Sequence, residues 1–501
     1  MKSVLEYLEK SEERFPDKLA VIDVENKCTY KELLNNSKKI GSFLIPYIQP
    51  KQPVVCFMDK SIFCLQAFFG IVYASGFYTL IDPNFPEERI QQILNTLNPA
   101  LILTNHSYDE KIGKLGNKYK KIYVEEIDSE IDEISLLERR KSAFDINPLY
   151  CNFTSGSTGT PKGVLVGHRS VIDFIDVFTE KFGMTEDDVI GNQAPFDFDV
   201  SVKDIYSTMK IGGTLVIIPR SYFMSPTKVI DMLEDNKVTT MIWAVSALCM
   251  LIRLHGFNYK VPKYIKRIMF SGEVMPIKQF NKLGKIYPKV QFVNLYGPTE
   301  ITCNCTYQIL NNEYSENEKI PIGIPFDNEE VFLLNEKNEI SKDGEKGEIC
   351  VSGTALALGY YNNPEMTTKN FMQNPLNKNY LETIYRTGDL AVKKDGVLYF
   401  AGRKDFQIKH MGHRIELEEI ESKANKISEL EHVCCIYDQN KNKIVMFYKG
   451  NIDKVTIINN LKKELPDYMI PNVFMMVDSM PLNKNGKTDR KALTTLYEGG
   501  K

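Results

Sequence analysis

Short apolar runs alternate with longer amphipathic stretches over much of the chain. Residues 54–59 (VVCFMD) are predicted to form a buried strand, an apolar helix follows, and residues 77–82 (FYTLID) form the next strand. This order is typical of a βαβ unit with parallel strands. The same alternation recurs around four later apolar runs, at 214–219, 239–245, 264–272 and 290–297. The pattern therefore predicts layered α/β subdomains with mostly parallel sheets.

The pattern changes after about residue 345. Short strands separated by Gly, Asp or Asn turns now indicate hairpins. Two amphipathic helices follow, at 416–427 and 454–465, and a charged GRKD stretch at 402–405 precedes them. We therefore predict a large α/β domain over residues 1–404 and a small α+β domain over residues 405–501.

One apolar stretch, CLQAFFGIVYASGFYTLI at 64–81, is long enough to raise the question of a membrane span. Gln66, Ser75 and Thr79 interrupt it, and it barely reaches the length that spanning requires. A buried helix that runs into a buried strand explains the stretch better. We expect no membrane span.

Composition and charge argue against nucleic-acid binding and against a zinc finger. Lys and Arg number 62 against 65 Asp and Glu, a net charge of −3, so no electrostatic argument favours nucleic acid. Cys303 and Cys305 have no second Cys or His pair at zinc-finger spacing. The N-terminus MKSVLEYLEK is not a signal peptide, and the ten cysteines are scattered. A cytoplasmic location is expected.

Unusual clusters follow two of the predicted strands, SGE at 271–273 and YGPTE at 296–300. Open α/β sheets bind ligands at the carboxyl ends of their strands, so these clusters are expected to converge. A third cluster, FTSGSTGTPKG at 153–163, crowds Gly, Ser and Thr around one lysine. It departs from the common P-loop pattern because Pro161 stands before Lys162 where that pattern has glycine. Hydroxyls, backbone N–H groups and one ammonium could still hold phosphates and release pyrophosphate, although a surface turn is the alternative.

Five motifs occur in order and together resemble the adenylate-forming superfamily of acyl-CoA synthetases, luciferases and peptide-synthetase adenylation domains. They are YCNFTSGSTGTPKG (150–163), NLYGPTE (294–300), YRTGDL (385–390), GRKDFQIKHMGHRIELEEIE (402–421) and NGKTDRKAL (485–493). The resemblance covers nearly the whole chain and implies a large N-terminal adenylate-forming domain with a small mobile C-terminal domain.

Two further stretches, at 76–90 and 465–471, narrow the resemblance to the amino-acid branch. FDFDVSVKDIY (196–206) and MFSGEVMP (269–276) are similar to free-standing D-alanine–carrier protein ligases. The implied chemistry uses ATP and Mg²⁺ to make an aminoacyl-adenylate, followed by transfer to the phosphopantetheine thiol of a carrier protein. No carrier domain follows the last motif, so the carrier is expected to act in trans. A small amino acid such as alanine is favoured; the alternatives are a polar or acidic amino acid, or an acyl- or aryl-CoA ligase.

The resemblance assigns the ATP-binding residues. The phosphate loop would act through Thr154, Ser155, Gly156, Ser157, Thr158, Gly159 and Lys162, of which Thr154 and Lys162 are also catalytic. Adenine would lie between Tyr296 and the backbone of Ser271, Gly272 and Glu273, beside Asn294, Gly297 and Thr299. Asp389 would bind the ribose hydroxyls, and Arg403 would reach the ribose or the α-phosphate. Glu300 would be the catalytic carboxylate that holds Mg²⁺, which needs few protein ligands when phosphates supply the rest.

Three further roles follow from the resemblance. Lys487 would stabilise the charge that builds up during adenylation. Asp405 would be the hinge of the small domain, and Gly412 would face the tunnel for the thiol. His410 and His413 are expected at the surface rather than in catalysis.

The amino-acid pocket is assigned in the same way. Asp199 would pair with the substrate's ammonium group and so reject simple fatty or aryl acids; the alternative is that it caps the following helix. The side-chain pocket would be lined by Val200, Lys203, Ala247, Met269, Ser271, Leu295, Cys303 and Asn304. Lys203 departs from the apolar or aromatic residue usual there. It either pairs with Asp199 or Asp204 or reaches solvent, or its ammonium meets a polar or acidic substrate.

Overall fold

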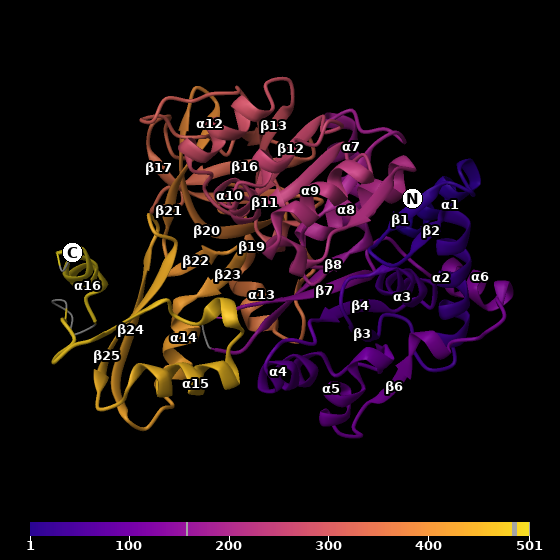
Figure 1. The fold of residues 1–501 in the computed structure, drawn as a ribbon, viewed down its shortest axis with the longest axis horizontal. Helices are drawn as coiled ribbons and strands as arrows, with labels where there is room; N and C mark the ends of the chain where they lie inside the picture. Colours follow the sequence, from indigo (N-terminus) through magenta and orange to yellow (C-terminus); the bar gives the residue numbers. More distant parts are fainter. Residues whose placement is uncertain (157–158, 483–487, 500–501) are drawn as a thin grey trace. The chain divides into compact units, whose positions relative to one another are not determined.

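The computed structural model describes residues 1–156, 159–482 and 488–499, and the chain divides into two compact units. Unit 1 comprises residues 1–83, 97–152 and 164–404; unit 2 comprises residues 84–96, 153–163 and 405–501. Unit 2 therefore contains the phosphate loop and most of helix α4 (Glu87–Leu97) from the N-terminal part of the chain. Figure 1 labels the helices and strands along the chain.

The largest sheet of unit 1 has nine strands in the order β15-β14-β13-β12-β11-β9-β10-β1-β2. Its strands are β1 (Leu19–Ile22), β2 (Lys27–Thr29), β9 (Val189–Asn192), β10 (Thr214–Ile217), β11 (Thr240–Ala244), β12 (Arg267–Ser271), β13 (Gln291–Tyr296), β14 (Thr306–Leu310) and β15 (Ile324–Pro325). The six neighbouring strands β13, β12, β11, β9, β10 and β1 are parallel to one another. The strands at the two edges, β2 on one side and β14 and β15 on the other, pair antiparallel. The four later strands expected from apolar runs are β10 to β13 of this sheet.

A second sheet has the order β18-β8-β7-β4-β3-β5-β6. Its strands are β3 (Pro53–Phe57), β4 (Phe77–Ile81), β5 (Leu101–Thr104), β6 (Lys120–Tyr123), β7 (Pro148–Thr154), β8 (Lys162–Gly167) and β18 (Gly359–Tyr360). The apolar stretch at 64–81 is the buried helix α3 (Ile62–Tyr73) followed by β4, as expected. In the part of the chain that the structure describes, no helix is both long and apolar enough to cross a membrane.

A third, antiparallel sheet completes unit 1. It contains β16 (Glu329–Leu334), β17 (Lys346–Gly353), β19 (Phe371–Gln373), β20 (Thr383–Lys394) and β21 (Val397–Arg403). The other helices of the unit are α1 (Leu5–Arg14), α2 (Tyr30–Leu44), α5 (Asp109–Lys114), α6 (Glu133–Lys141), α7 (His168–Lys181), α8 (Val200–Ile211), α9 (Pro226–Asp235), α10 (Val245–Arg253), α11 (Gly256–Tyr259), α12 (Ile277–Ile286) and α13 (Pro364–Asn370).

Local signals explain where several helices begin and end. Thr29 and Glu32 form a capping box at the start of α2, which satisfies backbone N–H groups that the helix itself leaves unpaired. Helix α8 ends at Gly212, whose φ is 73°. A Cβ at this glycine would lie 2.7 Å from the ring of Phe15, so both the conformation and the space require glycine.

Helices cover both faces of the nine-stranded sheet. Helices α7 and α8 pack on one face, where the core includes Phe174, Val202, Ile205, Ile242, Met269 and Val293. Helices α9, α10 and α12 pack on the other, where it includes Leu233, Leu248, Phe280, Trp243, Ile268 and Phe270. Adjacent strand residues alternate between the two cores, as the two-residue period of a strand requires.

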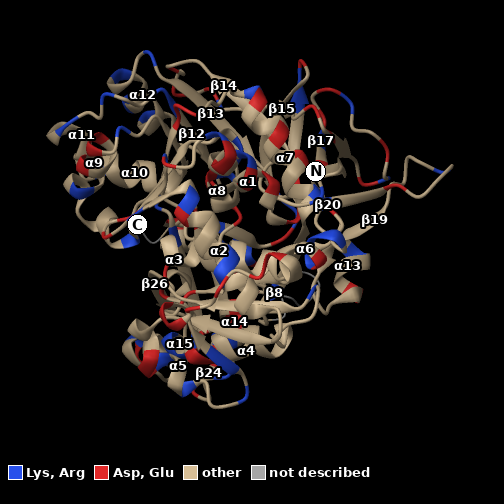
Figure 2. Cartoon of the chain, turned by 90° about the vertical axis from the view of Figure 1, so that its right-hand side faces the viewer, with Lys and Arg blue, Asp and Glu red and all other residues tan. Residues whose placement is uncertain are grey.

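Unit 2 is an α+β unit with its own core. Its strands are β22 (Gln407–His410), β23 (His413–Glu416), β24 (Leu430–Asp438), β25 (Lys443–Gly450) and β26 (Val473–Met476). Its helices are α14 (Leu417–Ala424), α15 (Lys454–Glu464), α16 (Arg490–Gly499) and most of α4 (Glu87–Leu97). A buried ion pair joins Arg89 of α4 to Glu419 of α14 at 2.9 Å. Acidic and basic residues are interspersed along the chain rather than gathered on one element (Figure 2).

Candidate functional site

The predicted adenine-binding residues of unit 1 lie at the carboxyl ends of β12 and β13. Ser271 ends β12 and Tyr296 ends β13, and these two strands pair in parallel. On β13 the side chains of Asn294 and Tyr296 point to the opposite face from Leu295, because strand residues alternate. The alternation therefore separates the predicted adenine residues from Leu295, which is predicted to line the amino-acid pocket.

Tyr296 and Asp389 form a buried pair. The Tyr296 hydroxyl donates to Asp389 Oδ2 at 2.6 Å, and Arg403 donates to Asp389 Oδ1 from the neighbouring strand β21. An ionised carboxylate offers about four acceptor positions, so two remain for hydroxyl groups of a ligand. The residue predicted to stack on adenine is thus tied directly to the residue predicted to bind ribose.

Glu300 lies in a short turn after β13 and is fully buried. Its Oε1 accepts a hydrogen bond of 2.7 Å from the Tyr360 hydroxyl, and its backbone carbonyl accepts one of 2.8 Å from Ala357 N. Tyr360 was not among the residues that the sequence singled out. It lies sixty positions from Glu300, and no spacing rule connects the two.

The chain bends sharply between Glu300 and β14. Thr302 and Cys303 adopt positive φ angles of 46° and 76°, which are rare outside glycine. A Cβ at Gly297 would lie 2.5 Å from the Cα of Asn304, so this close approach requires glycine in the NLYG motif. The bend therefore brings Cys303 and Asn304 beside the end of β13.

Three of the residues predicted for the amino-acid pocket, Asp199, Val200 and Lys203, lie at or just before the start of α8, whereas Ala247 belongs to the core on the other face of the sheet. Asp199 occupies the N-cap position, but its side chain makes no capping hydrogen bond, so the capping alternative is not realised. Cys303 Sγ donates to the Asp199 carbonyl at 3.1 Å. Of the other predicted residues, Lys203, Ala247, Met269, Ser271, Leu295 and Asn304 are buried, and Val200 is half-buried.

Lys203 is fully buried, and its Nζ donates to Asn304 Oδ1 at 2.5 Å. Burial lowers its pKa, while the nearby Cys303, Asp199 and Asp204 oppose that shift. It reaches no solvent, and the ion pairs among the described residues do not include it. Asp204 instead accepts a hydrogen bond of 2.7 Å from Asn192, and burial raises the pKa of its carboxyl to about 7.

The phosphate loop belongs to unit 2. Ser155 Oγ donates to the Arg414 carbonyl at 2.7 Å and accepts from Glu416 N at 3.2 Å. Thr154 Oγ1 is buried without a hydrogen-bond partner among the described residues, so a phosphate oxygen would satisfy it. Ser157, Thr158 and Lys487 lie outside the described residues.

The other predicted residues of unit 2 lie around the β22–β23 hairpin. Asp405 Oδ1 accepts from Gln407 N at 3.2 Å, and Gly412 forms the turn with a φ of 83°. The expected surface position is wrong for His410, which is buried and lies 3.1 Å from Asn442 Oδ1. Burial lowers its pKa, so the ring favours the neutral form.

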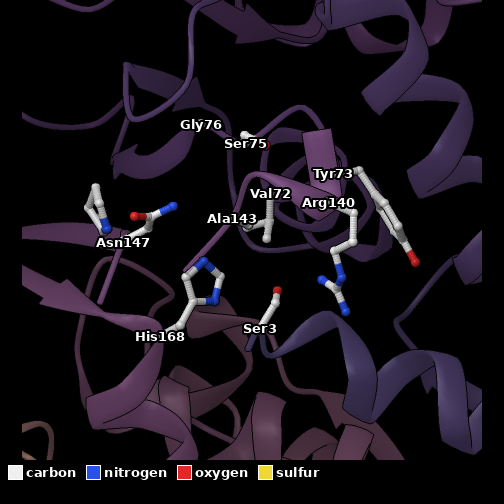
Figure 3. A pocket seen from close by; sticks show the side chains of 10 residues that line it. Ser3, Val72, Tyr73, Ser75, Gly76, Arg140, Ala143, Asn147 and His168 are labelled. Atoms are coloured by element: carbon white, nitrogen blue, oxygen red, sulfur yellow. The ribbon is translucent and has the colours of Figure 1, made fainter. Parts of the chain in front are cut away.

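A small cavity in unit 1 lies among residues that the sequence did not single out (Figure 3). Its lining includes Ser3, Arg140, Asn147 and His168. His168 Nδ1 accepts from Val4 N at 3.3 Å, and burial lowers the pKa of the ring to about 3. Neutral His168 thus acts as a buried hydrogen-bond acceptor for the backbone of the N-terminal segment.

Comparison with known proteins identifies the family to which the chain belongs. Residues 8–361 match the family model described as AMP-binding enzyme. The chain is 34% identical to zwittermicin A synthase ZmaJ of Bacillus cereus, covering 96% of this chain and 93% of that protein. It is also 30% identical to tyrocidine synthase 1 of Brevibacillus parabrevis, where the match covers 98% of this chain but only 45% of that longer protein.

Solved structures show the same fold. The Vibrio cholerae adenylation domain AlmE, in complex with glycyl-adenosine-5′-phosphate, matches with a TM-score of 0.85 at 20% identity, covering 99% of this chain and 98% of that one. An NRPS protein containing adenylation and PCP domains matches with a TM-score of 0.86 at 22% identity, covering 99% and 84%. The expected α/β adenylation-domain fold is confirmed.

Proposed function

This chain belongs to the AMP-binding enzyme family, and we propose that it activates an amino acid as an aminoacyl-adenylate and passes it to a carrier protein. The observation that carries this proposal is the placement of Asp199, buried at the start of α8 without a capping role. A buried carboxylate stabilises a cationic group beside it, and the α-ammonium of an amino acid is such a group. An acyl- or aryl-CoA ligase would have no use for this charge.

In the first half-reaction the substrate carboxylate attacks the α-phosphorus of ATP, and the bond to pyrophosphate breaks. Tyr296 orients the adenine, and Asp389 accepts the ribose hydroxyls at the positions that Tyr296 and Arg403 leave open. Thr154 and Lys162 hold the departing phosphates. Lys487 stabilises the charge that develops on the reacting oxygens.

The residues fit a magnesium ion bound chiefly through the nucleotide. Glu300 offers a single buried carboxylate, and the described residues contain no cluster of three or more His, Cys, Asp or Glu side chains. Mg²⁺ commonly takes one or two carboxylates and completes its shell with phosphates and waters. The ion would neutralise phosphate charge, while Tyr360 holds the Glu300 carboxylate in position.

In the second half-reaction the thiol of a phosphopantetheine arm attacks the activated carbonyl, and AMP leaves. We propose that the carrier is a separate protein acting in trans and that Gly412 lies beside the path of the thiol. The proposed substrate is an amino acid with a small side chain, because two residues predicted to line the pocket, Lys203 and Met269, are large and fully buried. All ten cysteines are buried, and we propose a cytoplasmic location for the protein.

Pyrophosphate exchange against a panel of amino acids, fatty acids and aryl acids tests the first half-reaction. Exchange with an amino acid and its loss in Asp199→Ala support the proposal. Exchange only with acids that lack an α-amine would instead establish the CoA-ligase alternative. Loading of radiolabelled amino acid onto a purified, phosphopantetheinylated carrier tests the second step.

A further inference from the structure

We propose that the substrate's side chain is short and carries an oxygen that accepts a hydrogen bond from Lys203, with a carboxylate as the best fit. This inference rests on the proposed amino-acid activation and deepens it. Alanine, which the overall resemblance favours, would leave the buried lysine without the partner that the pocket is built to meet.

The first argument is that the ammonium group of Lys203 has more hydrogen-bond donors than the described contacts satisfy. Its ammonium group has three donors and is fully buried, yet the described contacts supply one acceptor, Asn304 Oδ1 at 2.5 Å. A buried ammonium with unsatisfied donors costs folding free energy. A substrate oxygen would satisfy a further donor at the moment of binding.

The neighbouring carboxylates do not take this place. The ion pairs among the described residues do not include Lys203. Asp204 accepts from Asn192 through Oδ2, and its Oδ1 has no hydrogen bond among the described residues, so it does not hydrogen-bond Lys203. Asn192 in turn accepts from Lys60 Nζ at 2.8 Å. The hydrogen bonds of Asn192 therefore link Asp204 to Lys60, whereas the ammonium of Lys203 is directed to Asn304.

The elements around Lys203 place it among the predicted substrate contacts. It extends from α8 to the bend after β13, which carries Cys303 and Asn304. Met269 shares one core with the residues of α8, and Ser271 lies two positions further along the same strand, on the same face. The lysine side chain thus fills part of this space, which favours a short substrate side chain.

Charge balance selects a carboxylate among possible acceptors. Asp199 is proposed to neutralise the α-ammonium, and the α-carboxylate is consumed in the reaction. Lys203 then remains as a positive charge without an ion-pair partner among the described residues, and the only other carboxylate that acts on it, Asp204, has its pKa raised to about 7 by burial. An anionic side chain would complement this charge. A hydroxyl or amide oxygen would accept the hydrogen bond but would leave the charge unbalanced.

Lys203 could instead have a purely structural role, in which its hydrogen bond to Asn304 only links α8 to the bend after β13. Measurements of substrate specificity distinguish this role from substrate binding. Pyrophosphate exchange is measured on the native protein with alanine, serine, asparagine, aspartate and glutamate. We expect aspartate to lead, followed by serine and asparagine, with alanine lower in kcat/KM by about 10²-fold or more. Alanine equal to or above every oxygen-bearing amino acid would overturn the inference, while exchange with none of them would count against the proposed function itself.

Substitution of Lys203 is the second part of the experiment. Lys203→Met keeps most of the length of the side chain without its charge. Lys60→Met is the matched control, because Lys60 bonds Asn192, which in turn bonds Asp204 of α8. We expect Lys203→Met to remove the preference for aspartate over alanine and Lys60→Met to retain it. An unchanged preference in a folded Lys203→Met protein would assign the lysine to a bridging role. If this variant fails to fold, the native panel still decides.

Discussion

Removal of the Tyr296 hydroxyl tests whether the predicted adenine and ribose residues work as one unit. Tyr296→Phe keeps the aromatic ring and deletes the 2.6 Å hydrogen bond to Asp389. Hydrogen bonds to charged groups contribute about 1.5–3 kcal/mol, and the buried carboxylate would lose one of its two donors. We expect the free energy of unfolding to fall by about this amount in urea denaturation.

The effect on ATP should be separate from the effect on stability. Without the hydroxyl the ring loses its fixed orientation, so we expect the KM for ATP in pyrophosphate exchange to rise by about tenfold, equivalent to about 1.4 kcal/mol. The KM for the amino acid should stay near its native value, because the pocket residues lie on the opposite face of β13.

A double-mutant cycle with Asp389→Asn provides the control. If the two residues act together, their effects on the KM for ATP should be non-additive by about 0.5–3 kcal/mol. The reasoning fails if Tyr296→Phe keeps both native stability and a native KM for ATP, since the hydroxyl would then orient nothing. It also fails if the two substitutions are simply additive.

Three further substitutions probe other parts of the chain. Lys487→Ala should slow adenylation by about 10²-fold or more and spare transfer from preformed adenylate; equal losses in separately measured half-reactions would contradict its role. Asp405→Pro should reduce carrier loading more than pyrophosphate exchange, because proline stiffens the predicted hinge; parallel losses would refute the hinge. Because burial lowers the pKa of His168 to about 3, the unfolded chain takes up a proton first as pH falls. Native stability should therefore drop by about 1.4 kcal/mol per pH unit below about pH 6.5, and His168→Gln should lack this part of the slope in urea titrations at pH 7, 6 and 5.

Much of the fold is predictable from the spacing of apolar residues. The strands β10 to β13 and the helix–strand pair at 64–81 each correspond to an apolar run bounded by polar residues. Alternation along β13 even indicates that Leu295 and Tyr296 face opposite sides. The order of the strands is less accessible, because β10 pairs with β1 across most of two hundred residues, and no local pattern records such a pairing.

The candidate site likewise contains residues that short motifs single out and residues that only the folded structure reveals. Motifs single out Glu300 and Asp389 as candidates because each lies in a recognisable short stretch of sequence. They do not identify Tyr360, whose hydroxyl reaches Glu300 only because β18 and the turn after β13 meet in the folded unit. Contacts of this kind depend on tertiary packing, so a single sequence carries no signal for them.

Lys203 shows how a local rule can point to the wrong partner. Asp199 and Lys203 are four positions apart, a spacing that brings side chains together on a helix. Asp199 occupies the N-cap position of α8 and has helical backbone angles, φ −58° and ψ −27°, yet this spacing does not decide the hydrogen bond that the lysine makes. The lysine bonds instead to Asn304, which two residues of positive φ bring beside the end of β13. The ammonium of Lys203 is thereby kept out of an ion pair with Asp199, the carboxylate that is proposed to meet the α-ammonium of the substrate. The two opposite charges can then bind opposite ends of one amino acid, which an internal ion pair between them would prevent.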